Sequence, residues 1–222
     1  MIERARGKSV LTADTLKELG KDVNYYPGVT EWFDAVNEYG KSKGVVIEHY
    51  IISSGLKKII EGTEIAKNFC EIFASEFVYD EYGVPYWPAV ALNYTSKIQF
   101  LYRINKGIFD VSDDKNLNDS MEERNRRIPF CNMIYIGDGL TDVPSMKVTK
   151  LNGGHSIRVY ADEQENARKM MKAGRINFMA KADYTKDSEL MRIVKRIVDM
   201  LAAENDLMEL SLSQYDKSKE NF

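Results

Sequence analysis

The fold of this 222-residue chain is decided by residues Met133–Asp142, MIYIGDGLTD. Four largely apolar residues lead into a glycine-rich turn. Such a run predicts a buried β-strand whose carboxyl end opens into a loop. Asp138 and Asp142 stand at that end, where two carboxylates suit a hard cation such as Mg2+ and a phosphate bound to it. A Gly-Asp-Gly turn is weak evidence alone, so its meaning depends on which other residues converge on it.

Composition places few restrictions on function but excludes some partners. The chain has 31 Lys and Arg against 34 Asp and Glu, a formal net charge of -3. This balance gives no sign of nucleic acid or an anionic membrane as partner. Cys70 and Cys131 form neither a disulfide framework nor a metal-ligand spacing, which fits a reducing cytoplasm. No apolar run approaches the length of a membrane span, and the charged N-terminus is not a signal peptide. We therefore expect a cytoplasmic protein.

Strands alternate with helix-sized segments along the chain. Periodicity predicts strands at 45–52, 134–136, 157–160 and 176–179, a hairpin of 73–79 with 84–87, and helices at 29–36, 96–104 and 190–201. Alternation of this kind predicts an α/β fold with a mainly parallel sheet and helices on both faces. Ligands then bind beyond the carboxyl ends of the strands.

Three groups of residues fall where such a ligand would bind. Ser53-Ser54-Gly55 follows one strand, Lys97 lies near the start of a helix, and Asp138 with Asp142 follows another strand. A hydroxyl and backbone N–H groups at a helix N-terminus form an anion seat. A lysine adds positive charge, and two aspartates hold a cation that offsets phosphate charge. The pattern indicates a phosphate and Mg2+ site.

These residues resemble known motifs. IISSG at Ile51–Gly55, Lys97 in KIQFL, and GDGLTD at Gly137–Asp142 resemble the second, third and fourth motifs of the haloacid dehalogenase superfamily. The closest likeness is to its phosphoserine-phosphatase-like phosphohydrolases, from Pro27 to Tyr184. The fourth motif is fairly specific, whereas the second and third persuade by order and spacing. The resemblance implies a Rossmannoid three-layer sandwich and a small phosphorylated metabolite as substrate.

The resemblance also implies a role for each site residue. Ser53, with Ser54 and Gly55, would bind the transferring phosphoryl group. Lys97 would stabilise that group and the nucleophile, and Asp138 and Asp142 would bind Mg2+. From the residues alone, other interpretations stay open. The serines and Asp142 could cap helices, Lys97 could be a solvated helix lysine, and Asp138 could serve an ordinary turn.

The first motif of the family, Asp-x-Asp-Gly-Thr/Ser with the nucleophile, is not found in this chain. The N-terminal candidate, Val10–Thr15, has one aspartate and no glycine, and Thr12 or Asp14 is better interpreted as a helix cap. In the family the nucleophile strand is central, between the strands that here end at Ser53 and Gly137. We therefore predict that this first central strand is missing. The two flanking strands would then pair directly or leave a gap filled by another segment or chain.

The expected organisation follows from that absence. Residues 1–26 would be the remnant of a helical cap and 27–210 the core, with a β-hairpin at 77–88 and a polar excursion at 106–127; residues 211–222 would form a frayed tail. A natural truncation, a split gene or a misplaced start codon would each give such a chain from a longer phosphatase. Exposed strand edges would make self-association plausible.

Three functions remain open at this point. The first is a Mg2+-dependent phosphomonoester hydrolase scaffold of the haloacid dehalogenase type, inactive by itself because the aspartate nucleophile is absent. The second is a catalytically dead remnant that binds phosphate and Mg2+ or regulates. The third is a fragment with no function of its own.

Overall fold

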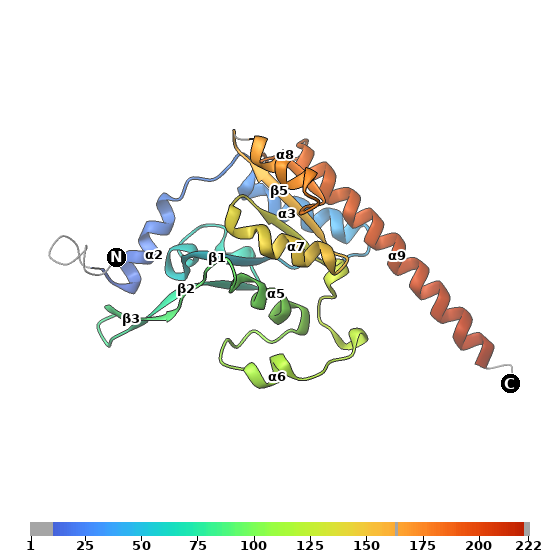
Figure 1. Ribbon diagram of the computed structural model, residues 1–222, viewed down its shortest axis with the longest axis horizontal. Coiled ribbons are helices and arrows are strands. Elements are labelled where there is room, and N and C mark those ends of the chain that lie inside the picture. The colour runs from blue at the N-terminus through green and yellow to red at the C-terminus, as the bar shows by residue number, and fades with distance from the viewer. Residues whose placement is uncertain (1–10, 163, 220–222) are drawn as a thin grey trace.

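The computed structural model describes residues 11–162 and 164–219, which form two three-stranded sheets and the helices around them (Figure 1). The strands are β1 (Tyr50–Leu56), β2 (Glu71–Tyr79), β3 (Pro85–Val90), β4 (Ile134–Gly137), β5 (His155–Tyr160) and β6 (Phe178–Lys181). The α-helices are α2 (Ala13–Glu18), α3 (Val29–Ser42), α4 (Lys57–Glu61), α5 (Lys97–Lys106), α6 (Asp114–Asn118), α7 (Val143–Leu151), α8 (Gln164–Lys172) and α9 (Glu189–Lys219). Short 3-10 turns are η1 (Leu19–Asp22), η2 (Ala66–Asn68), η3 (Glu123–Asn125), η4 (Phe130–Asn132) and η5 (Leu140–Asp142).

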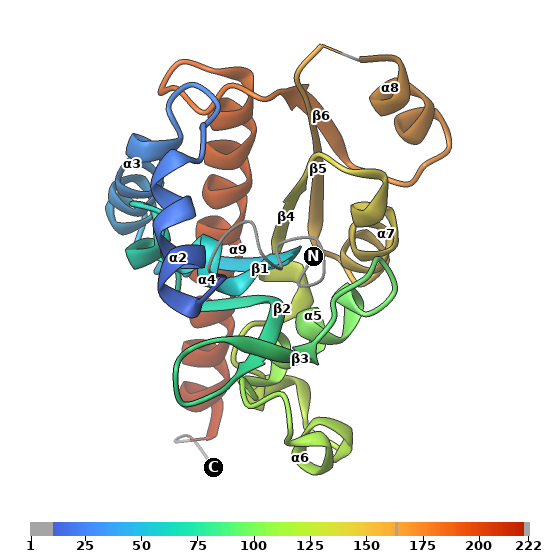
Figure 2. The ribbon, with the colours of Figure 1, turned by 90° about the vertical axis from the view of Figure 1, so that its left-hand side faces the viewer.

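The sheets are mainly parallel, as predicted. In the first sheet β1 pairs in parallel with β2, and β3 returns antiparallel as a hairpin. In the second sheet β4, β5 and β6 are all parallel, in that order. Figure 2 shows α3 and α9 on one side of the β4–β5–β6 sheet and α7 and α8 on the other. The α/β prediction with helices on both faces is therefore confirmed.

The predicted gap lies between the two sheets. Within residues 11–162 and 164–219, β1 pairs only with β2 and β4 pairs only with β5, so β1 and β4 are not hydrogen-bonded to each other. The described part of the N-terminal segment, 11–26, forms α2 and η1 rather than a strand. Residues 1–10 of the predicted cap remnant lie outside the described residues. No described segment therefore occupies the place of the missing central strand.

The first strand differs from its prediction. A strand was expected over 45–52, but β1 covers Tyr50–Leu56. Residues 45–49 are β-branched and apolar in part, yet no ladder forms along them, and Val46 is 90% exposed. The physical reason is the absence of a neighbour, because β-propensity gives a strand only where another strand can pair with it. The ends of the predicted C-terminal strands and of the hairpin shift by at most three residues.

Two apolar cores lie on the two faces of the sheets. One gathers Trp32 of α3, Ile157 of β5 and Val194 of α9. The other gathers Phe73 of β2 and residues of α5 and α7. In β4 the side chains alternate, since Tyr135 is buried in the second core while Ile134 and Ile136 pack against the first. The β4 strand is thus covered on both faces, as strands of parallel sheets are.

The polar excursion at 106–127 is tied to the body by helix α5. Arg103 is fully buried and donates from Nη1 to the Asp110 carbonyl at 2.7 Å and from Nη2 to the Val111 carbonyl at 2.9 Å. Lys106 Nζ donates to the Leu117 carbonyl at 2.5 Å. The excursion is therefore polar, as predicted, but ordered by side chains of the preceding helix.

The C-terminal tail is helical where fraying was expected. Helix α9 continues through residues 211–219, and residues 220–222 lie outside the described part. Figure 1 shows this end of α9 reaching beyond the body of the protein. Residues 202–219 contain neither glycine nor proline and many good helix formers, which explains the continuation. In the described residues no helix combines the length and apolar character that crossing a membrane requires.

Candidate functional site

The turn after β4 is folded tightly by its two glycines. A Cβ placed on Gly137 would lie 2.8 Å from both Cβ and Cγ of Asp142, so a side chain there would displace the aspartate. The backbone N–H of Gly139 donates to Asp142 Oδ2 at 3.0 Å. The turn therefore brings Asp142 back against the end of β4.

Asp142 forms a buried ion pair with Lys97. Each of the two residues is 6% exposed, and Lys97 Nζ lies 2.7 Å from Asp142 Oδ1. The Tyr135 hydroxyl donates to the same oxygen at 2.8 Å. Burial, assisted by the Asp142 charge, raises the pKa of Tyr135, which keeps the hydroxyl protonated as a donor. Lys97 is therefore not a solvated helix lysine. Asp142 occupies the N-cap position of α7 but makes no capping bond.

Asp138 and Ser53 line one cavity although they belong to different sheets. The cavity has a volume of about 580 Å3 and is bounded by residues 23–33, β1, α4, β4 and Tyr184. The Asp138 side chain is exposed and has no hydrogen bond among the described residues, so it does not serve as an ordinary turn cap. Burial first, and then the Asp138 charge, raise the pKa of Tyr184 to about 12. Asp138 is therefore the free carboxylate of this cavity.

The serine end of the site is less constrained. Ser53 Oγ accepts a hydrogen bond from the Gly55 N–H at 3.0 Å, and the pairing of β1 with β2 shifts register between Ser53 and Leu56. Ser54 and Gly55 are exposed and do not line the cavity. We expected an anion-binding site at the N-terminus of a helix that begins at Ser53–Gly55. That helix boundary is wrong, because β1 continues to Leu56. The helix after it, α4, has five residues and no side-chain cap.

Few of the carboxylate oxygens at this turn are free to bind Mg2+. Asp142 Oδ1 already accepts two hydrogen bonds and Oδ2 accepts one, which leaves one lone-pair position on Oδ2. Asp138 adds a free carboxylate. Among the described residues no three His, Cys, Asp or Glu side chains gather as a metal site. Two carboxylates are the usual protein contribution to Mg2+, which keeps several waters and binds substrate phosphate as well. The carboxylate oxygens left available to a cation are thus those of Asp138, which lines the cavity, and one position on Oδ2 of Asp142, which does not line it.

Sequence reasoning missed the aromatic wall of the cavity. Tyr26 and Tyr184 stack with ring centroids 6.5 Å apart, and Trp32 meets Tyr184 edge-on at 5.1 Å. Tyr26 lies in a segment that the sequence assigned to a cap remnant, and nothing in its spacing pointed to the site. Tyr135 carried a signal, because it alternates with Ile134 and Ile136 along the strand.

Comparisons with known proteins agree with this fold. No family model matches the chain. An uncharacterized protein of Borreliella burgdorferi is 29% identical in an alignment that covers 79% of this chain and 67% of that protein. The crystal structure of cytosolic 5'-nucleotidase IIIB bound to cytidine is similar with a TM-score of 0.52 at 14% identity, over 85% of this chain. The chain spans 56% of that nucleotidase, and at this identity the likeness concerns the fold alone. The chain has a haloacid dehalogenase-like fold.

Proposed function

We propose that this chain carries the magnesium and phosphate part of a phosphomonoester hydrolase of the haloacid dehalogenase type, and that it is inactive by itself. One observation carries the proposal: Ser53 and Asp138, from separate sheets, line the same cavity, while the Asp138 turn also fixes the buried Lys97–Asp142 pair. A hydroxyl, an ammonium group and carboxylates together supply the donor, the positive charge and the oxygen ligands that a phosphate and a hard cation need.

Each residue then has a defined part. The Ser53 hydroxyl would donate to a phosphate oxygen, and Asp138 with Oδ2 of Asp142 would hold Mg2+, which offsets phosphate charge when bound. Lys97 would add a fixed positive charge. The aromatic wall, with Tyr26, supports a phosphorylated metabolite that carries a planar or apolar group.

The lining of the cavity supports inactivity. Asp138 is the one acidic residue among the described residues that line it. With Asp138 engaged by the cation, no second carboxylate is left there to attack phosphorus. Phosphate-monoester hydrolysis without catalysis is extremely slow, so binding would not lead to turnover. The same observation supports a second candidate, a binding or regulatory remnant that keeps phosphate and Mg2+ affinity.

Calorimetric titration of inorganic phosphate with and without Mg2+ tests the site. We expect Mg2+-dependent binding by the wild-type chain that weakens about tenfold or more, roughly 1.4 kcal/mol, in Ser53→Ala and in Asp138→Asn. Ser54→Ala and Asp206→Asn are the matched controls, because both side chains are exposed and outside the cavity. Equal affinity in all four variants, or no binding by the wild type, would contradict the proposal.

A further inference from the structure

Arg158 of β5 is a buried cation with almost no partner. The residue is 8% exposed, and among the described residues its guanidinium makes a single hydrogen bond, from Nη1 to the Gly137 carbonyl at 3.5 Å. It forms no ion pair with a described carboxylate, in contrast to the buried Lys97. Because burying an ionised group without a partner costs free energy, the positive charge of Arg158 is left uncompensated in the folded chain.

Arg103 shows how the same chain compensates another buried guanidinium. Its two Nη atoms donate to three backbone carbonyls between residues 110 and 113 and to the Asp114 carboxylate, at 2.7–3.4 Å. Nε lacks a partner in both arginines. In Arg158, however, Nη2 also has no acceptor among the described residues, and it is not fully buried. The Nε–Nη2 edge of Arg158 is therefore free to bind a ligand.

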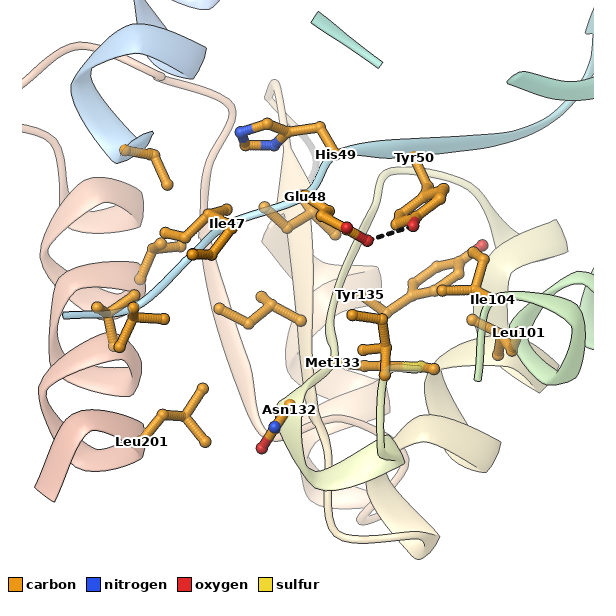
Figure 3. A pocket seen from close by; sticks show the side chains of 18 of the residues that line it. Ile47, Glu48, His49, Tyr50, Leu101, Ile104, Asn132, Met133, Tyr135 and Leu201 are labelled. Atoms are coloured by element: carbon orange, nitrogen blue, oxygen red, sulfur yellow. Dashed lines mark hydrogen bonds between the residues drawn. The ribbon is translucent and has the colours of Figure 1, made fainter. Parts of the chain in front are cut away.

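The strand register places Arg158 beside the turn that follows β4. Arg158 pairs with Gly137, the last residue of β4. Its two neighbours along β5 belong to the first core, so the Arg158 side chain projects to the opposite face of the sheet. In Figure 3 the Tyr135 ring lies beside Leu101 and Ile104 of α5, which marks that same face on β4. Arg158 therefore lies on the face that α5 and α7 cover.

Helix α7 begins over this face and adds to the positive charge. A Cβ on Gly137 would lie 2.8 Å from Cγ of Asp142, the N-cap residue of α7, and 2.8 Å from Cε of Met146. The amino-terminal end of a helix carries a partial positive charge. Lys97 already pairs with the Asp142 carboxylate. The charges of Arg158 and of the helix end are thus left for another anion.

We propose that Arg158 forms a second anion site, which binds a small oxyanion such as inorganic phosphate through Nε and Nη2. The two parallel N–H groups of a guanidinium edge match two oxygens of one oxyanion. This site is distinct from the candidate cavity, because that cavity is lined by Ile134 and Ile136, which face the first core. The anion needs no Mg2+, since Arg158 itself supplies the opposite charge. The proposal therefore does not rest on the proposed function.

Thermal unfolding without divalent cations tests the site. Sodium chloride is replaced stepwise by phosphate, up to about 50 mM at constant ionic strength, so that a ligand of the folded state raises the midpoint. The variants are Arg158→Met and its matched control Arg168→Met, since Arg168 is exposed on α8. Phosphate also stabilises folded proteins without specific binding, and that part should be equal in both variants.

We expect Arg158→Met to unfold in chloride at the same or a higher temperature than the wild type, because it removes an unpaired buried charge. Phosphate should raise the midpoint of the wild type and of Arg168→Met by more than that of Arg158→Met. In nitrogen–proton NMR spectra the Nε–H signal of Arg158, identified by its loss in Arg158→Lys, should shift saturably with phosphate. The lysine variant should bind about tenfold more weakly, since it lacks the paired donors.

Two results would overturn the proposal. One is an equal response to phosphate in the wild type and Arg158→Met. The other is a loss of stability in Arg158→Met together with an unshifted Nε–H signal, which would assign Arg158 a structural role. The two phosphate sites can fail separately: binding that requires Mg2+, Ser53 and Asp138 belongs to the candidate cavity, whereas binding that requires Arg158 and persists in Asp138→Asn without Mg2+ belongs to the second site.

Discussion

The two halves of the candidate site differ in how firmly they are held. On the β4 side, Asp142 is buried and accepts hydrogen bonds from Lys97, Tyr135 and Gly139. On the β1 side, Ser53 accepts one local bond, and the strand around it shifts register. The two halves lie at the ends of β1 and β4, and among the described residues each of these strands has a paired strand on one side alone. The β4 half is nevertheless fixed, because its contacts come from α5 and from its own turn. The β1 half depends on strand pairing, which is incomplete.

The largest effect should come from breaking the fixed half. Lys97→Met would leave the Asp142 carboxylate buried without its cation, which costs about 3–5 kcal/mol of the free energy of unfolding. Urea unfolding measures it. Lys21→Met is the control, because the Lys21–Glu18 pair is exposed and should change stability by less than about 1 kcal/mol. Equal losses in the two variants would show that the buried pair does not hold the site.

Removing the Tyr135 hydroxyl, the neutral donor to Asp142, should lower the free energy of unfolding by less than Lys97→Met does. Tyr135→Phe keeps the ring in the core but deletes the 2.8 Å hydrogen bond to Asp142. A hydrogen bond to a charged group contributes about 1.5–3 kcal/mol. Unfolding of Y135F and of the K97M/Y135F double variant gives the coupling between the two donors. Additive losses would indicate that they act independently.

The free energy of unfolding should depend on pH through His49, which directly precedes β1. Burial lowers the pKa of His49 to about 4, so the folded state holds this imidazole neutral. Its unfolded pKa is near 6.5, so the unfolded state takes up a proton first as the pH falls, and stability is lost between about pH 6.5 and 4. Because the ring is partly exposed, we expect a loss of about 1–2 kcal/mol from pH 7 to 5. His49→Gln should flatten this part of the curve, and an unchanged slope would exclude His49 as its source.

The smallest effect on stability is expected at Ser53. Its hydroxyl accepts one bond, from Gly55, within a partly exposed strand end. Ser53→Ala should therefore change the free energy of unfolding by no more than about 0.5 kcal/mol while weakening phosphate binding. A large loss of stability in S53A would mean that the β1 half is as firmly built as the β4 half.

The sequence predicted what local patterns determine. The strand and turn at Ile134–Asp142, the alternation of strands and helices, and the start of α9 follow from periodicity and glycine placement. The position of β1 did not follow, because pairing with β2, rather than the β-branched run at 45–49, decides where the strand begins. The ladder starts at Tyr50.

Long-range contacts were equally hidden from the sequence. Nothing local shows that Lys97 meets Asp142, 45 positions away, or that Arg103 gathers the carbonyls of the following excursion. The order of the motifs did place Lys97 beside the turn that follows β4, where it meets Asp142. It did not show that Ser54 and Gly55 lie outside the cavity, because the direction of side chains at an irregular strand end depends on the partner strand.

Hydrolysis of 4-nitrophenyl phosphate by the purified chain with Mg2+, compared with its Asp138→Asn variant, tests the central claim most directly. The claim is that the chain holds a phosphate and cation site without a nucleophile. We predict that both proteins release nitrophenol at the uncatalysed rate. Turnover by the wild-type chain that Asp138→Asn abolishes would contradict it, because the described cavity would then contain a complete active site.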